Sequence, residues 1–146
     1  MNWQFKPFTA LTAWELYAAL QLRSEVFVVE QTCVFQDIDG ADEAAFHLTA
    51  FVGTRLVAYA RCFPATVKYL EASIGRVVTH SSQRGTGLGH QLMHRAIDGL
   101  IGQWGAQPIR IGAQARLETF YRKHNFDPTG QRYLEDGIAH IEMLRR

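Results

Sequence analysis

One segment constrains the fold of this chain more than any other: a strand-like run that leads through a glycine-rich loop into a helix. The run at 74–79 is followed by residues 84–90, which read Arg-Gly-Thr-Gly-Leu-Gly-His and are called the glycine loop below. Glycines let successive backbone N–H groups converge on an anion, because no Cβ blocks the approach. A helix N-terminus adds unpaired N–H donors and the positive end of a dipole. The segment therefore predicts a cradle for a phosphate or pyrophosphate group.

The helix after the glycine loop is predicted from the spacing of its apolar residues, which recur at three and four positions. One row consists of Leu88, Leu92, Ala96 and Leu100, and a second consists of Met93, Ile97 and Ile101.

The residues of the glycine loop do not fit two common phosphate-binding motifs. A Walker A loop ends in Gly-Lys-Ser/Thr, whereas Gly89 is followed by His90 and Gln91. A Rossmann fingerprint has the spacing Gly-x-Gly-x-x-Gly and an acidic residue about twenty positions further on. Here glycines alternate with other residues, and no Asp or Glu stands at that distance. Neither a Walker-type ATP site nor a Rossmann NAD site is expected.

Bulk properties indicate an ordinary soluble protein. The 146 residues suggest one domain over 1–146 with a substantial core. The net charge of +1, with no basic block, gives little support for binding nucleic acid. No apolar run reaches the roughly 20 residues of a transmembrane helix, and the N-terminus lacks the apolar core of a signal peptide. We therefore expect a cytoplasmic protein with neither nucleic acid nor membrane as a partner.

The two cysteines, Cys33 and Cys62, give no indication of a metal site. They lack CxxC spacing and a nearby histidine pattern of the kind that binds zinc. Reduced, partly buried thiols are the expected state, and no metal cofactor is expected.

The order of the predicted elements indicates a mixed α/β fold. A capping box at Thr12 and Glu15 starts a helix that runs to about Val29. Three strands before the glycine loop imply an antiparallel meander, and the later strand–helix–strand crossover implies a parallel pair. We expect a mixed β-sheet of this kind flanked by helices. The expected strands are 2–8, 46–52, 56–63, 70–79, 109–114, 131–135 and 138–144, the last two forming a hairpin around Asp136-Gly137.

The glycine loop also carries a family resemblance. Its first six residues match the Q/R-x-x-G-x-G/A acetyl-coenzyme A motif of the GNAT N-acetyltransferase superfamily, which the chain resembles over nearly its whole length. Segment 115–126 looks like that family's later tyrosine-bearing helix. Asn125 replaces the usual Gly there, and Asn also tolerates a left-handed helix end. More narrowly, the chain is similar to the ElaA-type group, through segments 22–31, 36–40, 74–77 and 135–143.

This resemblance implies acetyl-coenzyme A or coenzyme A as the co-substrate. Val77, Val78 and Thr79 would offer backbone groups to the pantetheine arm and the thioester carbonyl. Tyr121 would be the general acid that protonates the departing thiolate; the alternative for Tyr121 is a core aromatic. The residues implied for the pyrophosphate are Arg84, Gly85, Thr86, Gly87, Leu88, Gly89 and His90.

The general base and the acceptor-binding residues stay open at this stage. Family members often place a Glu on the strand before the glycine loop, where this chain has Arg76 instead. His140 and Glu142 share one strand face by period two and would form an acceptor-binding pair if that face lines a cleft. The acceptor-site candidates are Glu25, Glu30, His47, Arg76, His140 and Glu142. The acidic segment at 37–42 is either a solvated loop or a patch that attracts a cationic amine, because its spacing does not fit an EF-hand.

Two functions follow from the resemblance. The first is an acetyl-coenzyme A-dependent N-acetyltransferase, in which a primary amine of a small molecule, peptide or protein attacks the thioester directly. The second is a catalytically weak sensor or interaction module that binds coenzyme A. Tyr121 and the intact glycine loop favour the enzyme, whereas the missing strand carboxylate keeps the alternative open. The sequence names neither the acceptor nor the oligomeric state, for which a homodimer is one option.

Overall fold

The computed structural model describes all 146 residues. The first four strands of the chain form an antiparallel sheet. Its strands follow chain order, so the predicted meander is confirmed and extended by one strand. Alternating or continuous apolar side chains favour these strands because one or both faces are buried. The strands are β1 (Asn2–Pro7), β2 (Phe46–Val52), β3 (Arg55–Phe63) and β4 (Ser73–Thr79).

A second antiparallel sheet follows from the C-terminal third of the chain. It has the strand order β5-β7-β6, formed by β5 (Ile109–Gln114), β6 (Asp127–Glu135) and β7 (Ile138–Arg145). Asp136 and Gly137 connect β6 to β7 with positive φ angles of 51° and 77°, as a two-residue turn of this kind requires. The predicted hairpin is therefore present, with β6 starting earlier than expected.

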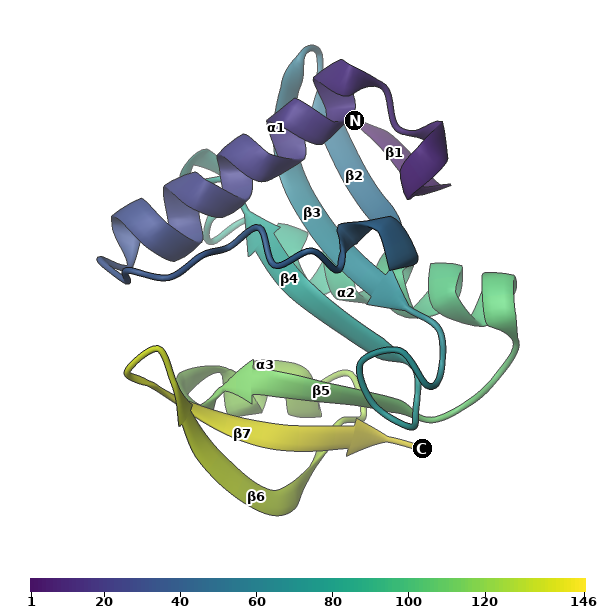
Figure 1. The fold of residues 1–146 in the computed structure, drawn as a ribbon, viewed down its shortest axis with the longest axis vertical. Helices are drawn as coiled ribbons and strands as arrows, with labels where there is room; N and C mark the ends of the chain where they lie inside the picture. The colour runs from purple at the N-terminus through teal and green to yellow at the C-terminus, as the bar shows by residue number, and fades with distance from the viewer.

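The predicted parallel pair exists, but it is very short. β4 and β5 meet through a single parallel bridge between Ala72 and Ile109, where the Arg110 N–H donates to the Ala72 carbonyl at 2.8 Å. Beyond that bridge the strands separate, and the two sheets diverge from a common base (Figure 1). A bulge contributes to this geometry: the β3–β4 register shifts opposite Arg76, whose φ of 48° bends β4.

The helices cover both faces of the first sheet. α1 (Ala13–Arg23) lies on one face and α2 (Leu88–Trp104) on the other (Figure 1). The capping box of α1 is present, since Thr12 and Glu15 exchange hydrogen bonds of 3.1 and 2.8 Å. The helix continues to Glu30, as predicted, but residues Ser24–Glu30 are π-helical. Such widened turns occur frequently at functional sites.

The core joins the two sheets across α2. A cluster of buried side chains includes Leu92 and Met93 of α2, Ile74 of β4, and Ile111 and Ile141 of the second sheet. α3 (Glu118–Arg122) closes the other side, and the turn after it ends at Asn125, which has the predicted left-handed conformation with a φ of 67°. No helix combines the length and apolar character needed to cross a bilayer.

Candidate active site

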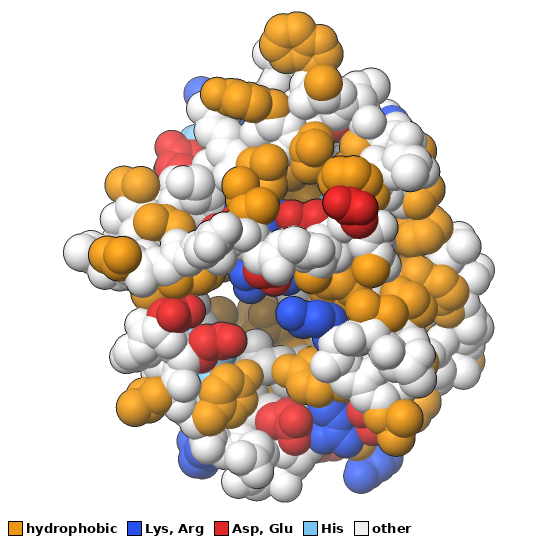
Figure 2. Space-filling view, in the orientation of Figure 1, with side chains coloured by type: hydrophobic (Ala, Val, Ile, Leu, Met, Phe, Trp, Pro, Cys, Tyr) orange, Lys and Arg blue, Asp and Glu red, His pale blue; other side chains and the backbone are white.

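A large cleft opens where β4 and β5 separate. Its volume is about 1140 Å³, and its walls are formed by β4, the glycine loop, α3 and the β6–β7 hairpin. Figure 2 shows this hollow near the middle of the molecule, with Lys and Arg side chains at its edge. Because the splayed strands leave the edge of β4 without a neighbour beyond Ala72, its backbone groups are available to a ligand. Val77, Val78 and Thr79 all line the cleft.

The glycine loop forms one end of the cleft, and its backbone has the geometry of an anion cradle. Gly85 and Gly87 have φ angles of 79° and 83°, and a Cβ at either position would meet no protein atom within 4 Å. Leu88, Gly89 and His90 form the first turn of α2, and their N–H groups have no backbone acceptor. Unpaired donors at a helix N-terminus favour a bound anion. The loop therefore has free space and free donors at the same place, which fits the pyrophosphate of a coenzyme A ester.

Two residues of the glycine loop have local partners. Arg84 forms an ion pair of 2.6 Å with Glu30, which lies at the end of the π-helical segment on the same cleft. Both side chains are more than 40% exposed, so this pair can exchange for a pair between Arg84 and a phosphate. Thr86 does not line the cleft, because its hydroxyl donates back to the Gln83 carbonyl at 2.5 Å.

Tyr121 lies in the cleft wall beside the glycine loop. Its ring packs edge-on against Phe120, which in turn stacks on His90 with 4.6 Å between ring centroids. The side chain is buried, yet its hydroxyl has no partner in the protein and is not sealed from the cleft. Burial raises the pKa of Tyr121 to about 12, so the phenol is protonated at neutral pH. This is the form that a general acid requires.

His140, on β7, also lines the cleft and has one ring nitrogen free to accept a proton. Its Nδ1–H donates to the Ile138 carbonyl at 2.8 Å, which leaves Nε2 as the acceptor in the neutral ring. Nε2 lies 3.6 Å from Glu135 Oε2, and the ring stacks on Tyr133 at 5.4 Å. A carboxylate beside Nε2 would stabilise the imidazolium that forms when this nitrogen takes up a proton.

Three of the predicted acceptor-site residues do not line the cleft. Glu25 is exposed on the π-helical segment. His47 is buried, with both ring nitrogens engaged, one by the Tyr59 hydroxyl at 2.6 Å and one by the Asp42 carbonyl at 2.9 Å. Glu142 accepts from Arg110 and from the Thr129 hydroxyl, both at 2.9 Å. Glu30, Arg76 and His140 do line it, so the structure brings together half of the predicted set.

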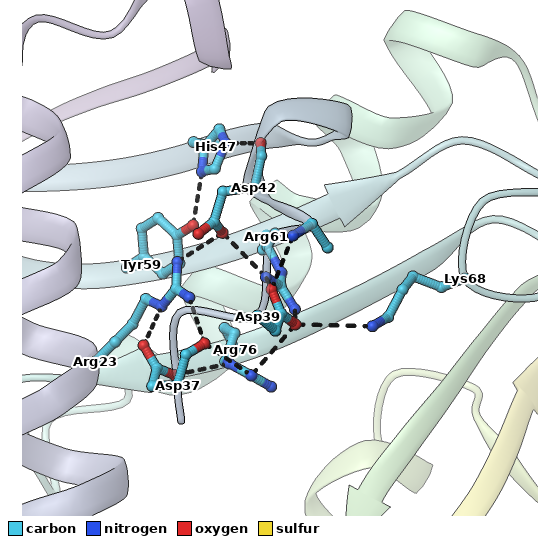
Figure 3. Close-up of polar contacts among 10 residues, drawn as sticks. Arg23, Asp37, Asp39, Asp42, His47, Tyr59, Arg61, Lys68 and Arg76 are labelled. Atoms are coloured by element: carbon cyan, nitrogen blue, oxygen red, sulfur yellow. Dashed lines mark hydrogen bonds and ion pairs between the residues drawn. The ribbon is translucent and has the colours of Figure 1, made fainter. Parts of the chain in front are cut away.

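The acidic loop 37–42 is neither a solvated loop nor a free anionic patch. Its three carboxylates are bound by arginines from α1, β3 and β4 (Figure 3). Buried Arg23 donates from Nε to Asp37 at 2.9 Å and from Nη1 to Asp42 at 2.7 Å. Arg61 holds Asp39 through two bonds of 2.8 Å. Ionised groups that leave water need such partners, so the loop folds inward.

Protonation states in this network follow from burial and pairing. Hydrogen bonds from Arg61 hold the pKa of Asp39 far below its ordinary value. Burial alone would raise the pKa of Asp42, but hydrogen bonds from Arg23 and Arg61 lower it overall. Burial lowers the pKa of His47 and keeps its ring neutral, with Nδ1 accepting from the Tyr59 hydroxyl. The network is therefore a scaffold of paired side chains beside β4.

One signal in the sequence points to this network, although it is a single residue and not a motif. Arg61 stands inside the otherwise apolar strand Leu-Val-Ala-Tyr-Ala-Arg-Cys-Phe at 56–63. A charged side chain at the centre of a buried strand is rarely tolerated without an ionic partner. The acidic loop 37–42 is the densest source of such partners in the chain.

Comparison with known proteins identifies the family of this chain. An acetyltransferase (GNAT) domain matches residues 16–146, so the chain belongs to the GNAT acetyltransferase family. The fold and the cleft are thus those of an enzyme that transfers acyl groups from acyl-coenzyme A. No group of three or more His, Cys, Asp or Glu side chains is arranged to hold a metal ion.

Individual relatives are similar over nearly the full length. Protein ElaA of Escherichia coli is 41% identical over 99% of this chain and 96% of its own. The crystal structure of ElaA has a TM-score of 0.92 with 99% of each chain covered. That of an acyl-CoA N-acyltransferase from Pseudomonas aeruginosa has a TM-score of 0.95, 44% identity and 99% coverage of each chain. The resemblance drawn from the sequence is therefore confirmed.

Proposed function

We propose that this protein transfers the acetyl group of acetyl-coenzyme A to a primary amine by direct attack. The observation that carries the proposal is the glycine loop, where open space over Gly85 and Gly87 meets the unpaired N–H groups of the first turn of α2. Arg84 adds a cation that can leave Glu30 for a phosphate. The co-substrate would supply an activated acetyl group, and its pantetheine arm would lie along Val77, Val78 and Thr79.

The cleft also supplies groups for the two proton transfers of the reaction. The neutral amine nitrogen forms a bond to the thioester carbon, and the carbon–sulfur bond breaks. His140 Nε2 would accept the proton that the ammonium must lose, with Glu135 stabilising the imidazolium. The Tyr121 hydroxyl would give its proton to the leaving thiolate, and the second proton that the acylated nitrogen loses would restore the phenol. Glu25, His47 and Glu142 have no part in this proposal, because they do not line the cleft.

A catalytically weak coenzyme A sensor is the alternative. It is favoured by one feature, the absence of a carboxylate on β4, where Arg76 stands. His140 and Tyr121, on the walls of the same cleft, favour the enzyme over the sensor. A cytoplasmic location is part of our proposal and agrees with two unpaired cysteines.

The proposal is tested first by ligand-induced stabilisation. Coenzyme A and acetyl-coenzyme A should raise the melting temperature, because a ligand that binds only the folded state stabilises it. ATP and NAD should give smaller shifts at equal concentration. Equal or larger stabilisation by ATP or NAD would rule out the assignment. Release of free thiol from acetyl-coenzyme A with a panel of amines then separates the enzyme from the sensor.

A further inference from the structure

Three cationic side chains in the cleft converge on one carboxylate oxygen. Oδ2 of Asp39 lies 2.8 Å from Arg61 Nη2, 3.5 Å from Arg76 Nη2 and 3.9 Å from Lys68 Nζ. Arg61, Lys68 and Arg76 form what we call the cationic cluster, and all three line the cleft. Figure 3 shows Lys68 reaching the cluster from the side opposite to Arg23.

The cationic cluster has more hydrogen-bond donors than the protein satisfies. The Lys68 ammonium carries three N–H donors and lies beyond hydrogen-bond distance of Asp39. Arg76 donates from Nε to Asp37 Oδ1 at 2.8 Å and from Nη2 to the Asp37 carbonyl at 3.1 Å, and its Nη1 has no protein partner. All three guanidinium nitrogens of buried Arg23 have carboxylate or carbonyl partners, at 2.7 to 3.1 Å. Arg61 Nε is buried without a partner, and the surplus donors that a ligand in the cleft can reach belong to Lys68 and Arg76, which are more exposed.

The cluster lies at the end of the cleft away from the phosphate cradle. β4 runs from Ser73 to Thr79 toward the glycine loop, and Arg61 pairs with Gly75, near the start of that strand. The cleft wall formed by β6, β7 and their turn carries the opposite charge, with Glu135 and Asp136 in the lining beside His140. His140 pairs with Gln114 at the far end of β5, whereas Arg61 lies near the base at which Ala72 meets Ile109. The cleft thus presents cations around Asp39 near its base, and carboxylates with a histidine on the other wall, further along.

We propose that the acceptor is a small amine that also carries a carboxylate, as an amino acid does. Lys68 and Arg76 would bind the carboxylate, because charge-assisted hydrogen bonds to such a group are short and strong. The ammonium would face Glu135 and His140 before it loses its proton. This inference rests on the proposed function, since it assigns the acceptor of the same cleft.

The test compares amines that differ only in the carboxylate. Thiol release from acetyl-coenzyme A is measured with L-lysine against cadaverine, L-ornithine against putrescine, and L-tyrosine against tyramine. Short peptides with free and amidated C-termini form a further arm, which separates a free amino acid from a peptide terminus as the source of the carboxylate. The carboxylated member of at least one pair should have a kcat/KM at least tenfold higher, about 1.4 kcal/mol.

Lys68 is the residue to change, because its exposed side chain makes no hydrogen bond on which the fold depends. Lys68→Gln should lower kcat/KM for the carboxylated amine about tenfold, mainly through KM, and should have a much smaller effect on kcat/KM for the partner that lacks the carboxylate. Lys68→Arg should retain the preference. Lys123→Gln, on an exposed lysine outside the cleft, is the matched control and should behave as wild type.

Each outcome decides one of the two hypotheses. Equal rates for paired amines, or a Lys68→Gln variant with an undiminished preference, would overturn the inference and leave acetyl transfer standing. The inference would also be overturned if coenzyme A binds but no carboxylated amine is acetylated and none raises the melting temperature. Failure of coenzyme A itself to bind would instead remove the proposed function.

Discussion

At the scale of single residues, the proposed acetyl transfer depends on which side chains carry a proton and which can accept one. Tyr121 is buried among aromatic rings, and burial raises its pKa to about 12, well above any pH at which the protein would work. His140 has the opposite arrangement, because the Ile138 carbonyl fixes its tautomer and leaves Nε2 as an acceptor. The two side chains therefore have complementary states, one protonated and one able to accept a proton.

Tyr121→Phe should lower kcat by roughly 10²–10⁴-fold, the usual range for general acid catalysis. The ring and its packing stay, so acetyl-coenzyme A affinity should change little, as expected for an interaction made mainly in the transition state. Single-turnover kinetics and titration calorimetry measure the two quantities. Tyr17→Phe, on the exposed face of α1, is the control. A wild-type single-turnover rate would reduce Tyr121 to a core aromatic.

His140→Gln should lower kcat/KM by roughly 10²-fold or more near neutral pH, since general base catalysis contributes on that scale. The deficit should shrink at higher pH, where more of the amine is already deprotonated and needs no base. A pH profile of kcat/KM measures this. His94→Gln, on an exposed histidine of α2 outside the cleft, should leave the profile unchanged. A constant deficit at all pH values would make His140 a structural residue.

At the scale of elements, the β4–glycine loop–α2 unit is the part that we propose binds acetyl-coenzyme A. Gly85 and Gly87, with Thr86 between them, both have a left-handed backbone conformation. These two conformations turn the backbone N–H groups of the loop toward one point. The bulge at Arg76 and the divergence of β5 then expose the edge of β4. In the proposed binding mode, strand, loop and helix would contact a single extended ligand along one continuous stretch of chain.

Gly87→Val should weaken acetyl-coenzyme A binding at least tenfold, about 1.4 kcal/mol. A branched side chain would fill the open space above the loop and strain a residue with a φ of 83°. Gly53→Val is matched for strain, because Gly53 also has a positive φ and empty surroundings but lies in the β2–β3 turn. Calorimetry on both folded variants separates ligand obstruction from strain. Normal binding by Gly87→Val would place the phosphates elsewhere.

At the scale of the whole molecule, the Arg–Asp network ties the acidic loop to α1, β3 and β4. Such a network stabilises the fold only while its carboxylates are ionised. Asp39 and Asp42 have folded-state pKa values below the ordinary value of 3.8. The unfolded chain therefore binds protons before the folded protein does. Their contribution is fully present above about pH 5 and is lost as the pH falls through 4 and below.

Asp39→Asn should accordingly flatten the dependence of unfolding free energy on pH between about 5 and 3. The variant should be less stable than wild type at neutral pH, because Arg61 and Arg76 lose a charged partner, and the difference should narrow in acid. Urea titrations at several pH values measure this. Asp127→Asn changes a carboxylate that is 77% exposed and should parallel wild type. Parallel curves for Asp39→Asn would show that this carboxylate is not a determinant of acid stability.

The sequence by itself determined the features that are encoded over short stretches of chain. The capping box at Thr12, the β6–β7 turn and the strand–glycine loop–helix unit each depend on residues a few positions apart, so local patterns predict them. The order of these elements was sufficient for the mixed α/β class. The residues around Tyr121 were sufficient to predict that it lies on one short helix.

Only the tertiary structure decided which polar side chains share the cleft. Arg76 and Asp37 are 39 positions apart in the chain, and Arg61 and Asp39 are 22 apart, so no local period connects them. The choice among histidines has the same origin: His47 is sealed between Tyr59 and Asp42, whereas His140 faces the cleft. Burial and ionic pairing depend on which distant segments meet, and that is settled when the sheets pack and β5 diverges from β4.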